Sequence, residues 1–161
     1  FVENKLDYTR KLFKAEGFAD NFEVGYHGGE FPIAEVNFPD EEAEVTIISY
    51  GGLINPLLNM MYDLYMEEEV ATRLLDLSSL TPMDFDLISK LAKDSKKILC
   101  VEEGHVPFGI GDGIISNLVQ HGMKAEFKSI GAKQHTIGTS KEAEAMALPQ
   151  IDEIKETILN W

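Results

Sequence analysis

The chain is poor in cysteine, in basic residues and in long apolar runs, and each shortage excludes a class of protein. Cys100 is the single cysteine among 161 residues, so no internal disulfide can form, and we expect a reducing, cytoplasmic location. No apolar run approaches the ~20 residues that a membrane span requires. Fourteen basic residues stand against 28 acidic ones, a formal net charge of −14, which disfavours nucleic acid and membrane surfaces as partners and favours a basic protein.

Recognisable catalytic signatures are missing as well. The sequence has no nucleophile elbow, no phosphate-loop lysine and no paired Cys/His spacing of a zinc site. It begins with Phe1 rather than methionine, so we expect a processed chain or a piece of a longer protein. Residue chemistry alone therefore predicts an acidic domain without a visible active site.

What the sequence does contain is an alternation of strand-like and helix-like segments after residue 44. The segments predicted as strands are 45–50, 70–77, 97–103 and 124–130, and those predicted as helices are 54–66, 80–93, 113–122 and one after Pro149. For the second helix we predict Thr81 as the cap, Pro82 at the first position and Asp84 in a capping box. The alternation predicts an α/β fold with three α/β/α layers and a mostly parallel, Rossmann-like sheet of about five strands. Residues 1–44 show no steady period, and we interpret them as an irregular lead-in or linker.

A glycine-rich turn follows the third predicted strand. Gly109, Gly111 and Gly113 have the spacing G-x-G-x-G, which differs from the G-x-G-x-x-G of a dinucleotide-binding turn. Asp112 lies among them, and a carboxylate at a helix N-terminus accepts the free N–H groups and repels phosphate. We therefore predict a turn that satisfies its own hydrogen bonds rather than a phosphate cradle.

Four polar residues near this turn are the candidate site. Glu102, Glu103 and His105 lie where the third strand ends, and Asp112 follows in the turn. Carboxylates beside a histidine could perform acid/base chemistry or hold a metal, and the alternative is a solvated loop whose acids face water. Cys100 lies in an apolar run, which favours a small buried residue over a nucleophile.

The landmarks occur in the order and spacing of a known family. The segments "VTIISYGGLINPLL", "LLDLSSLTPMDFDLI", "ILCVEEGHVPFGIGDGI" and "LPQIDEIKETIL" resemble the carboxy-terminal domain of transketolase-like enzymes. They are most similar to the beta subunit, or fused alpha/beta chain, of thiamine diphosphate-dependent 2-oxo acid dehydrogenases of the pyruvate, branched-chain and acetoin group. The resemblance covers residues 45–161, and "FVENKLDY" resembles the end of the preceding pyrimidine-binding domain. It implies a boundary between residues 1–44, the end of that domain and a linker, and a transketolase C-terminal-like domain over 45–161.

The resemblance implies a domain without catalytic or metal-binding residues of its own. In such enzymes thiamine diphosphate and Mg²⁺ bind between other domains, and the carboxy-terminal domain holds subunits together. It implies a homo-oligomer or an assembly of alpha and beta subunits, and contact with the subunit-binding domain of a dihydrolipoyl acyltransferase. Trp161 occupies the chain end that joins this contact in several relatives, and the alternative is that it packs the last helix onto the sheet.

Two other functions stay open at this point. The domain could belong to a transketolase or a deoxyxylulose phosphate synthase-like enzyme, with sugar phosphates as substrates. It could also be a freestanding ligand-binding or regulatory module that uses the turn from Glu102 to Asp112 as its pocket.

Overall fold

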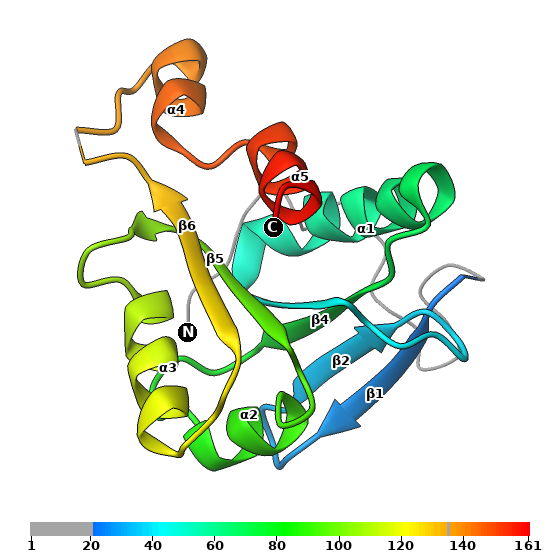
Figure 1. The fold of residues 1–161 in the computed structure, drawn as a ribbon. Helices are drawn as coiled ribbons and strands as arrows, with labels where there is room; N and C mark the ends of the chain where they lie inside the picture. Colours follow the sequence, from blue (N-terminus) through cyan, green and yellow to red (C-terminus); the bar gives the residue numbers. More distant parts are fainter. Residues whose placement is uncertain (1–20, 135) are drawn as a thin grey trace.

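The computed structural model describes residues 21–134 and 136–161, which form one six-stranded sheet with helices on both faces (Figure 1). The strands are β1 (Glu23–His27), β2 (Ile33–Asn37), β3 (Val45–Ser49), β4 (Thr72–Leu77), β5 (Lys97–His105) and β6 (Glu126–Ala132). The helices are the short 3₁₀ helix η2 (Gly51–Leu53), α1 (Ile54–Glu68), α2 (Phe85–Leu91), α3 (Ile110–Gln120), α4 (Lys141–Ala147) and α5 (Ile151–Leu159).

The strand order is β1-β2-β4-β3-β5-β6, and its larger part is parallel. Strand β3 pairs in parallel with both β4 and β5, and β5 pairs in parallel with β6. The pairs β1–β2 and β2–β4 are antiparallel. The predicted fold class, a mostly parallel sheet between two helix layers, is confirmed, with six strands in place of about five.

The interpretation of residues 21–44 as irregular was wrong, because this segment contributes β1 and β2. In register, Val24 faces Val36 and Tyr26 faces Ala34, so apolar side chains alternate along both strands as a half-covered sheet requires. Gly28, with φ of 100°, supplies the left-handed backbone that the connecting turn needs. The hairpin extends the same sheet through β4, whereas the predicted end of a preceding domain at residues 1–20 lies outside the described residues.

Two apolar layers cover the central strands. Helices α1 and α5 pack on one face with a cluster that includes Ile47 and Leu74, and α2 and α3 pack on the other with a cluster that includes Ile48 and Leu75 (Figure 1). Every residue of β3 is buried, which explains why its sequence is a continuous apolar run rather than an alternating one. Burial of a large apolar side chain contributes about 1.5–3 kcal/mol, so these two clusters hold the layers together.

Two predicted helices begin at other residues than expected, and one further helix was not predicted. Helix α3 begins at Ile110 rather than at Gly113. Helix α2 begins at Phe85 rather than near Pro82, and its cap is Asp84, whose carboxylate accepts a hydrogen bond from the Leu87 N–H at 2.9 Å. The Ser79 hydroxyl donates to the Pro82 carbonyl, so the residues before Asp84 form a turn of their own. Helix α4 was not predicted, and it begins after Ser140, whose hydroxyl accepts from the Ala143 N–H.

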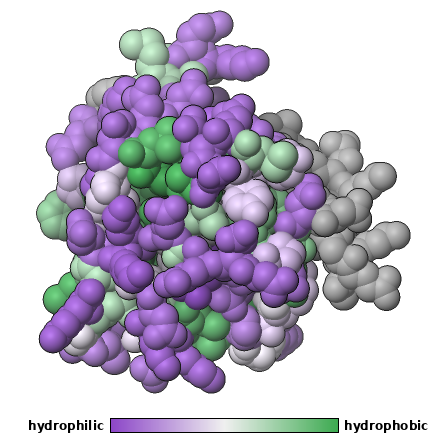
Figure 2. Space-filling view, turned by 45° about the vertical axis from the view of Figure 1, so that its right-hand side comes forward, coloured by the Kyte–Doolittle hydropathy of each residue, from purple (hydrophilic) through white to green (hydrophobic). Residues whose placement is uncertain are grey.

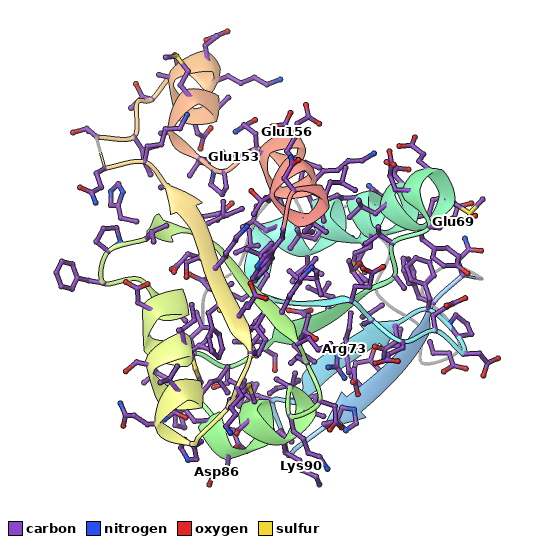
Figure 3. The ribbon with its side chains drawn as sticks, in the orientation of Figure 1. Glu69, Arg73, Asp86, Lys90, Glu153 and Glu156 are labelled. Carbon is purple, nitrogen blue, oxygen red and sulfur yellow. The ribbon has the colours of Figure 1, made fainter. Side chains whose placement is uncertain are left out.

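The face shown in Figure 2 is mostly hydrophilic, with small separate apolar patches. Acidic and basic side chains of the outer helices point away from the sheet, as Glu153 and Glu156 on α5 and Asp86 and Lys90 on α2 do in Figure 3. Within residues 21–134 and 136–161, no helix is long and apolar enough to cross a membrane.

Candidate functional site

The carboxyl ends of the three central parallel strands place Tyr50, Asp76 and Glu102 along one edge of the sheet. Tyr50 directly follows β3, Asp76 lies near the end of β4, and Glu102 lies in the last part of β5. Asp76 is in register with Ser49 of β3, and the Ser49 hydroxyl donates to the Val101 carbonyl of β5 at 2.8 Å. In open parallel sheets ligands bind at this edge, so it is the candidate functional site.

Glu102 accepts several of the hydrogen bonds at this edge. Its side chain is only 3% exposed, and both carboxylate oxygens accept hydrogen bonds from the first turn of α3. Oε2 accepts from the Ile110 N–H at 3.0 Å and Oε1 from the Gly111 N–H at 2.8 Å, and the Tyr50 hydroxyl donates to Oε2 at 3.4 Å. A carboxylate at a helix N-terminus is stabilised both by these N–H groups and by the helix dipole.

The glycines around Glu102 make room for its carboxylate. A Cβ added to Gly104 would lie 2.8 Å from Oε2 of Glu102, and one added to Gly111 would lie 2.9 Å from the Cβ of Cys100. Gly113, by contrast, has open space around it. The spacing of Gly109 and Gly111 therefore serves the close approach of the α3 N-terminus to β5, and not a dinucleotide.

The other three residues of the predicted cluster are exposed and do not join Glu102. Glu103 and His105 point into solvent, and the His105 ring approaches the Ala132 carbonyl at 3.4 Å. Asp112 accepts a hydrogen bond from the Phe108 N–H at 3.1 Å and so closes the loop before α3. Among the residues that the structure describes, no group of three His, Cys, Asp or Glu side chains could hold a metal ion.

The titrating groups beside Glu102 are held in their protonated forms. Burial, and then the Glu102 charge, raise the pKa of Tyr50 to about 12. Burial, with Glu102 and Asp112 adding to it, also raises the pKa of the Cys100 thiol to about 12. A thiol with such a pKa supplies almost no thiolate near neutral pH, so the arrangement does not activate Cys100 as a nucleophile.

At the start of α3, the hydrogen-bonding groups of this edge stabilise the fold and are not available to a ligand. A pyrophosphate would need the N–H groups at the start of α3, but two of these already donate to Glu102. The described residues of this turn therefore do not fit the phosphates of a cofactor, and the turn satisfies its own hydrogen bonds as the sequence predicts. The sequence indicated Asp112 for this role, whereas Glu102, from the preceding strand, is the residue that binds Ile110 and Gly111.

Sequence reasoning missed a second feature at the same edge, a cavity of about 130 Å³ that is lined in part by Asp76. Burial raises the pKa of Asp76 from its ordinary 3.8 to about 6. The signal was present, because Asp76 is an acidic residue inside the apolar run "RLLDL". It was overlooked because the β1–β2 hairpin, which forms much of the cavity, was not predicted.

Trp161 lies against the sheet rather than free of it. Its ring contacts the α1/α5 cluster, its indole N–H donates to Glu126 at 3.1 Å, and the Lys128 ammonium lies 4.5 Å from the ring centroid. The Lys97 ammonium donates to the carbonyl oxygen of Trp161 at 2.9 Å. The residue thus joins the last helix to the edge strand β6 and stays partly exposed, and its role at a subunit contact remains a prediction.

Comparison with known proteins agrees with this architecture. A family described as "Transketolase, C-terminal domain" matches residues 34–154. The mitochondrial pyruvate dehydrogenase E1 component subunit beta-2 of Oryza sativa subsp. japonica is 26% identical over 157 residues, covering 96% of this chain and 40% of the rice protein. The 1-deoxy-D-xylulose-5-phosphate synthase of Acaryochloris marina is 26% identical over 106 residues, covering 66% of this chain and 16% of that enzyme.

Among solved structures, one described as "Split gene transketolase, inactive beta4 tetramer" superposes with a TM-score of 0.64 at 21% identity, covering 74% of this chain and 39% of that one. This chain therefore spans less than half the length of these relatives. Relatives that match this chain include pyruvate dehydrogenase E1 beta subunits and deoxyxylulose phosphate synthases. Because the family match covers residues 34–154, which is most of the chain, the chain belongs to the transketolase C-terminal domain family.

Proposed function

We propose that the chain is the subunit-assembly domain of a thiamine diphosphate-dependent 2-oxo acid dehydrogenase and is not catalytic alone. The observation that carries the proposal is the closure of the carboxyl edge by Glu102, which uses the N–H groups of α3 that a cofactor phosphate would need. Thiamine diphosphate and Mg²⁺ then belong to other parts of the parent enzyme. There they supply the carbanion chemistry that decarboxylates the 2-oxo acid before acyl transfer to lipoyl groups.

The outer surface near the C-terminus supports a basic protein partner. Helix α5 presents Asp152, Glu153 and Glu156 to solvent, and α4 adds Glu142 and Glu144, as the outward-pointing Glu153 and Glu156 of Figure 3 illustrate. The lysine of α5, Lys155, forms an ion pair with Glu67 of α1. An acidic surface attracts a basic partner, and this attraction weakens as the salt concentration rises. Such a surface suits the predicted partner, the subunit-binding domain of a dihydrolipoyl acyltransferase.

A second candidate is supported by the relatives themselves. Deoxyxylulose phosphate synthases match this chain at identities similar to those of the E1 beta subunits, so a parent enzyme that acts on sugar phosphates is the alternative. The structurally similar split gene transketolase is described as an inactive beta4 tetramer, which supports self-association of a separately encoded chain. A cytoplasmic location stays part of the proposal, although the rice relative is mitochondrial.

The test uses the complete native protein with any alpha subunit, thiamine diphosphate and Mg²⁺. Reduction of an artificial electron acceptor is measured with pyruvate, branched-chain 2-oxo acids and 2-oxoglutarate, beside assays for ketol transfer and for deoxyxylulose phosphate formation. Cofactor-dependent turnover of one 2-oxo acid supports the proposal, whereas activity with ketose phosphates or deoxyxylulose phosphate formation alone supports the second candidate. The 161-residue chain by itself is expected to show none of these activities.

The assembly role is tested separately by reversing charge on α5. The double variant Glu153→Lys/Glu156→Lys is expected to weaken binding of a basic acyltransferase subunit-binding domain at least tenfold in a salt-dependent way. The matched control, Asp86→Lys/Asp94→Lys, carries the same change of charge on and after α2, on the other face of the sheet, and is expected to bind almost normally. Equal effects of both variants would exclude α5 as the contact.

A further inference from the structure

The cavity beside Asp76 has a defined wall in the described part of the chain. The cavity is lined by strand residues, by the first residue of α1 and by two residues next to strand ends. These are Val24 and Tyr26 of β1, Ala34 and Val36 of β2, Asp76 of β4, Ile54 of α1, and Pro32 and Ser78. Tyr26 pairs with Ala34, and Ala34 with Asp76, so these three form one row across a single face of the sheet.

This cavity combines an apolar body with one charged group, as small-molecule sites do. Within residues 21–134 and 136–161, no hydrogen bond or ion pair engages the Asp76 carboxylate, and the Ser78 hydroxyl donates to the Pro32 carbonyl. The titratable groups among the described lining residues are Asp76 and the Tyr26 phenol of β1. The lining residues that β2 and α1 contribute are apolar. Asp76 is half-buried, and a carboxylate that is partly removed from water without a counter-charge is unfavourable, so a cation that entered the cavity would relieve this cost.

We propose that this cavity is a binding site for a small organic cation, an amine with a compact apolar body, whose ammonium group meets the Asp76 carboxylate. The volume of about 130 Å³ is close to the roughly 150 Å³ of an engineered cavity that holds benzene, so the apolar body has about five or six carbon atoms. The carboxylate disfavours anions, which excludes 2-oxo acids and sugar phosphates from this site. The cavity is also distinct from the proposed assembly surface, because it is lined by β1, β2, β4 and the start of α1, whereas the assembly contact is assigned to α5.

The charge of Asp76 depends on pH over the range in which the chain can be studied. With a pKa of about 6, Asp76 is mostly ionised at pH 7.5 and mostly protonated at pH 5, where the attraction for an ammonium group is lost. Affinity for the amine is accordingly expected to fall about tenfold between pH 7.5 and pH 5, because each pH unit below the pKa removes about nine tenths of the ionised form.

The experiment titrates the full 161-residue chain with cyclopentylamine and follows backbone amide resonances. Saturable shifts are expected at Tyr26, Ala34 and Ile54, with a dissociation constant on the order of 1 mM for so small a ligand. Cyclopentanol, which has the same ring without the charge, and cyclopentanecarboxylate, which has the opposite charge, are each expected to bind at least tenfold more weakly.

Two variants separate the carboxylate from the cavity. Asp76→Asn keeps the shape and is expected to weaken amine binding at least tenfold, whereas Ala34→Leu fills the space and is expected to abolish it. Ala145→Leu, at an exposed position of α4, is the matched control and is expected to bind as the unaltered chain does.

Three results would overturn the proposal. The first is the absence of saturable shifts at these amides, and the second is equal affinity for the amine and the alcohol. The third is an Asp76→Asn variant that binds the amine as tightly as the unaltered chain. The ligand comparison needs no variant, so the proposal stays open to refutation even if Ala34→Leu does not fold.

Discussion

Replacement of Glu102 tests whether the closed edge of the sheet is a structural device. The carboxylate is buried and accepts two backbone N–H groups, at 2.8 and 3.0 Å. In Glu102→Gln the remaining side-chain oxygen can still accept a hydrogen bond from one backbone N–H. The amide nitrogen cannot accept from the second N–H, because it is itself a donor. The adjacent Glu103 is exposed, so Glu103→Gln is a matched control with the same chemical change one residue away.

The expected loss follows from the two hydrogen bonds. A hydrogen bond to a charged group contributes roughly 1.5–3 kcal/mol, and a neutral one about 1 kcal/mol. Losing one charged bond and weakening the other gives a decrease of about 2–4 kcal/mol in the free energy of unfolding for Glu102→Gln. An exposed substitution such as Glu103→Gln usually changes it by less than about 0.5 kcal/mol.

Urea unfolding followed by circular dichroism measures this difference. With a denaturant slope of about 2 kcal/mol/M, the midpoint of Glu102→Gln is expected to fall by about 1–2 M. Native-state hydrogen exchange should also accelerate at the Ile110 and Gly111 amides, the two donors. A variant with an unchanged midpoint and unchanged exchange at these amides would refute the assignment of Glu102 as the residue that closes the edge.

Four further predictions concern other positions. Gly111→Ala is expected to lower the free energy of unfolding by about 1–3 kcal/mol, because its Cβ would lie 2.9 Å from the Cβ of Cys100. Gly113→Ala should raise the free energy of unfolding by up to about 1 kcal/mol, because the new methyl group has open space and alanine favours a helix more than glycine does. Cys100 should resist a thiol reagent at pH 8 in the folded protein and react in urea, since burial raises its pKa to about 12. Asp76→Asn should be more stable than the unaltered chain by about 2–3 kcal/mol at pH 7.5, because the folded chain must ionise an aspartate whose pKa is raised from 3.8 to about 6. This difference in the free energy of unfolding should disappear as the pH falls from 6 to below 4, where Asp76 is protonated in both the folded and the unfolded state. Trp161→Phe should cost about 1 kcal/mol through loss of the indole hydrogen bond, measured by urea unfolding.

Each of these has a contrary outcome. Equal effects of the two glycine substitutions would contradict the crowding at Gly111, and fast labelling of Cys100 in the folded chain would contradict its burial. A stability difference for Asp76→Asn that grows toward low pH would reverse the sign worked out above. An unaltered unfolding curve for Trp161→Phe would show that its contacts with β6 contribute no stability.

The regular part of the fold was readable from the sequence because local patterns and tertiary environment agree there. The segment "VTIISY" is apolar throughout, as a strand covered on both faces must be, and β3 is buried at every position. The stop of α3 at Gly122, with φ of 79°, was likewise predictable, because glycine adopts this backbone without steric cost. The hairpin of β1 and β2 was missed because its apolar residues are few and become a pattern only when the two strands pair.

The sequence by itself determined the fold class, the family resemblance and the absence of a recognisable catalytic motif, since all three depend on residue type and on spacing along the chain. Only the tertiary structure decided which carboxylate closes the turn before α3. Glu102 and Gly111 are nine residues apart, and their contact at 2.8 Å exists because the turn brings the helix N-terminus back against its own strand. The structure alone also revealed the cavity at Asp76, because β1, β2, β4 and α1 are separate segments that enclose it only after the sheet has formed.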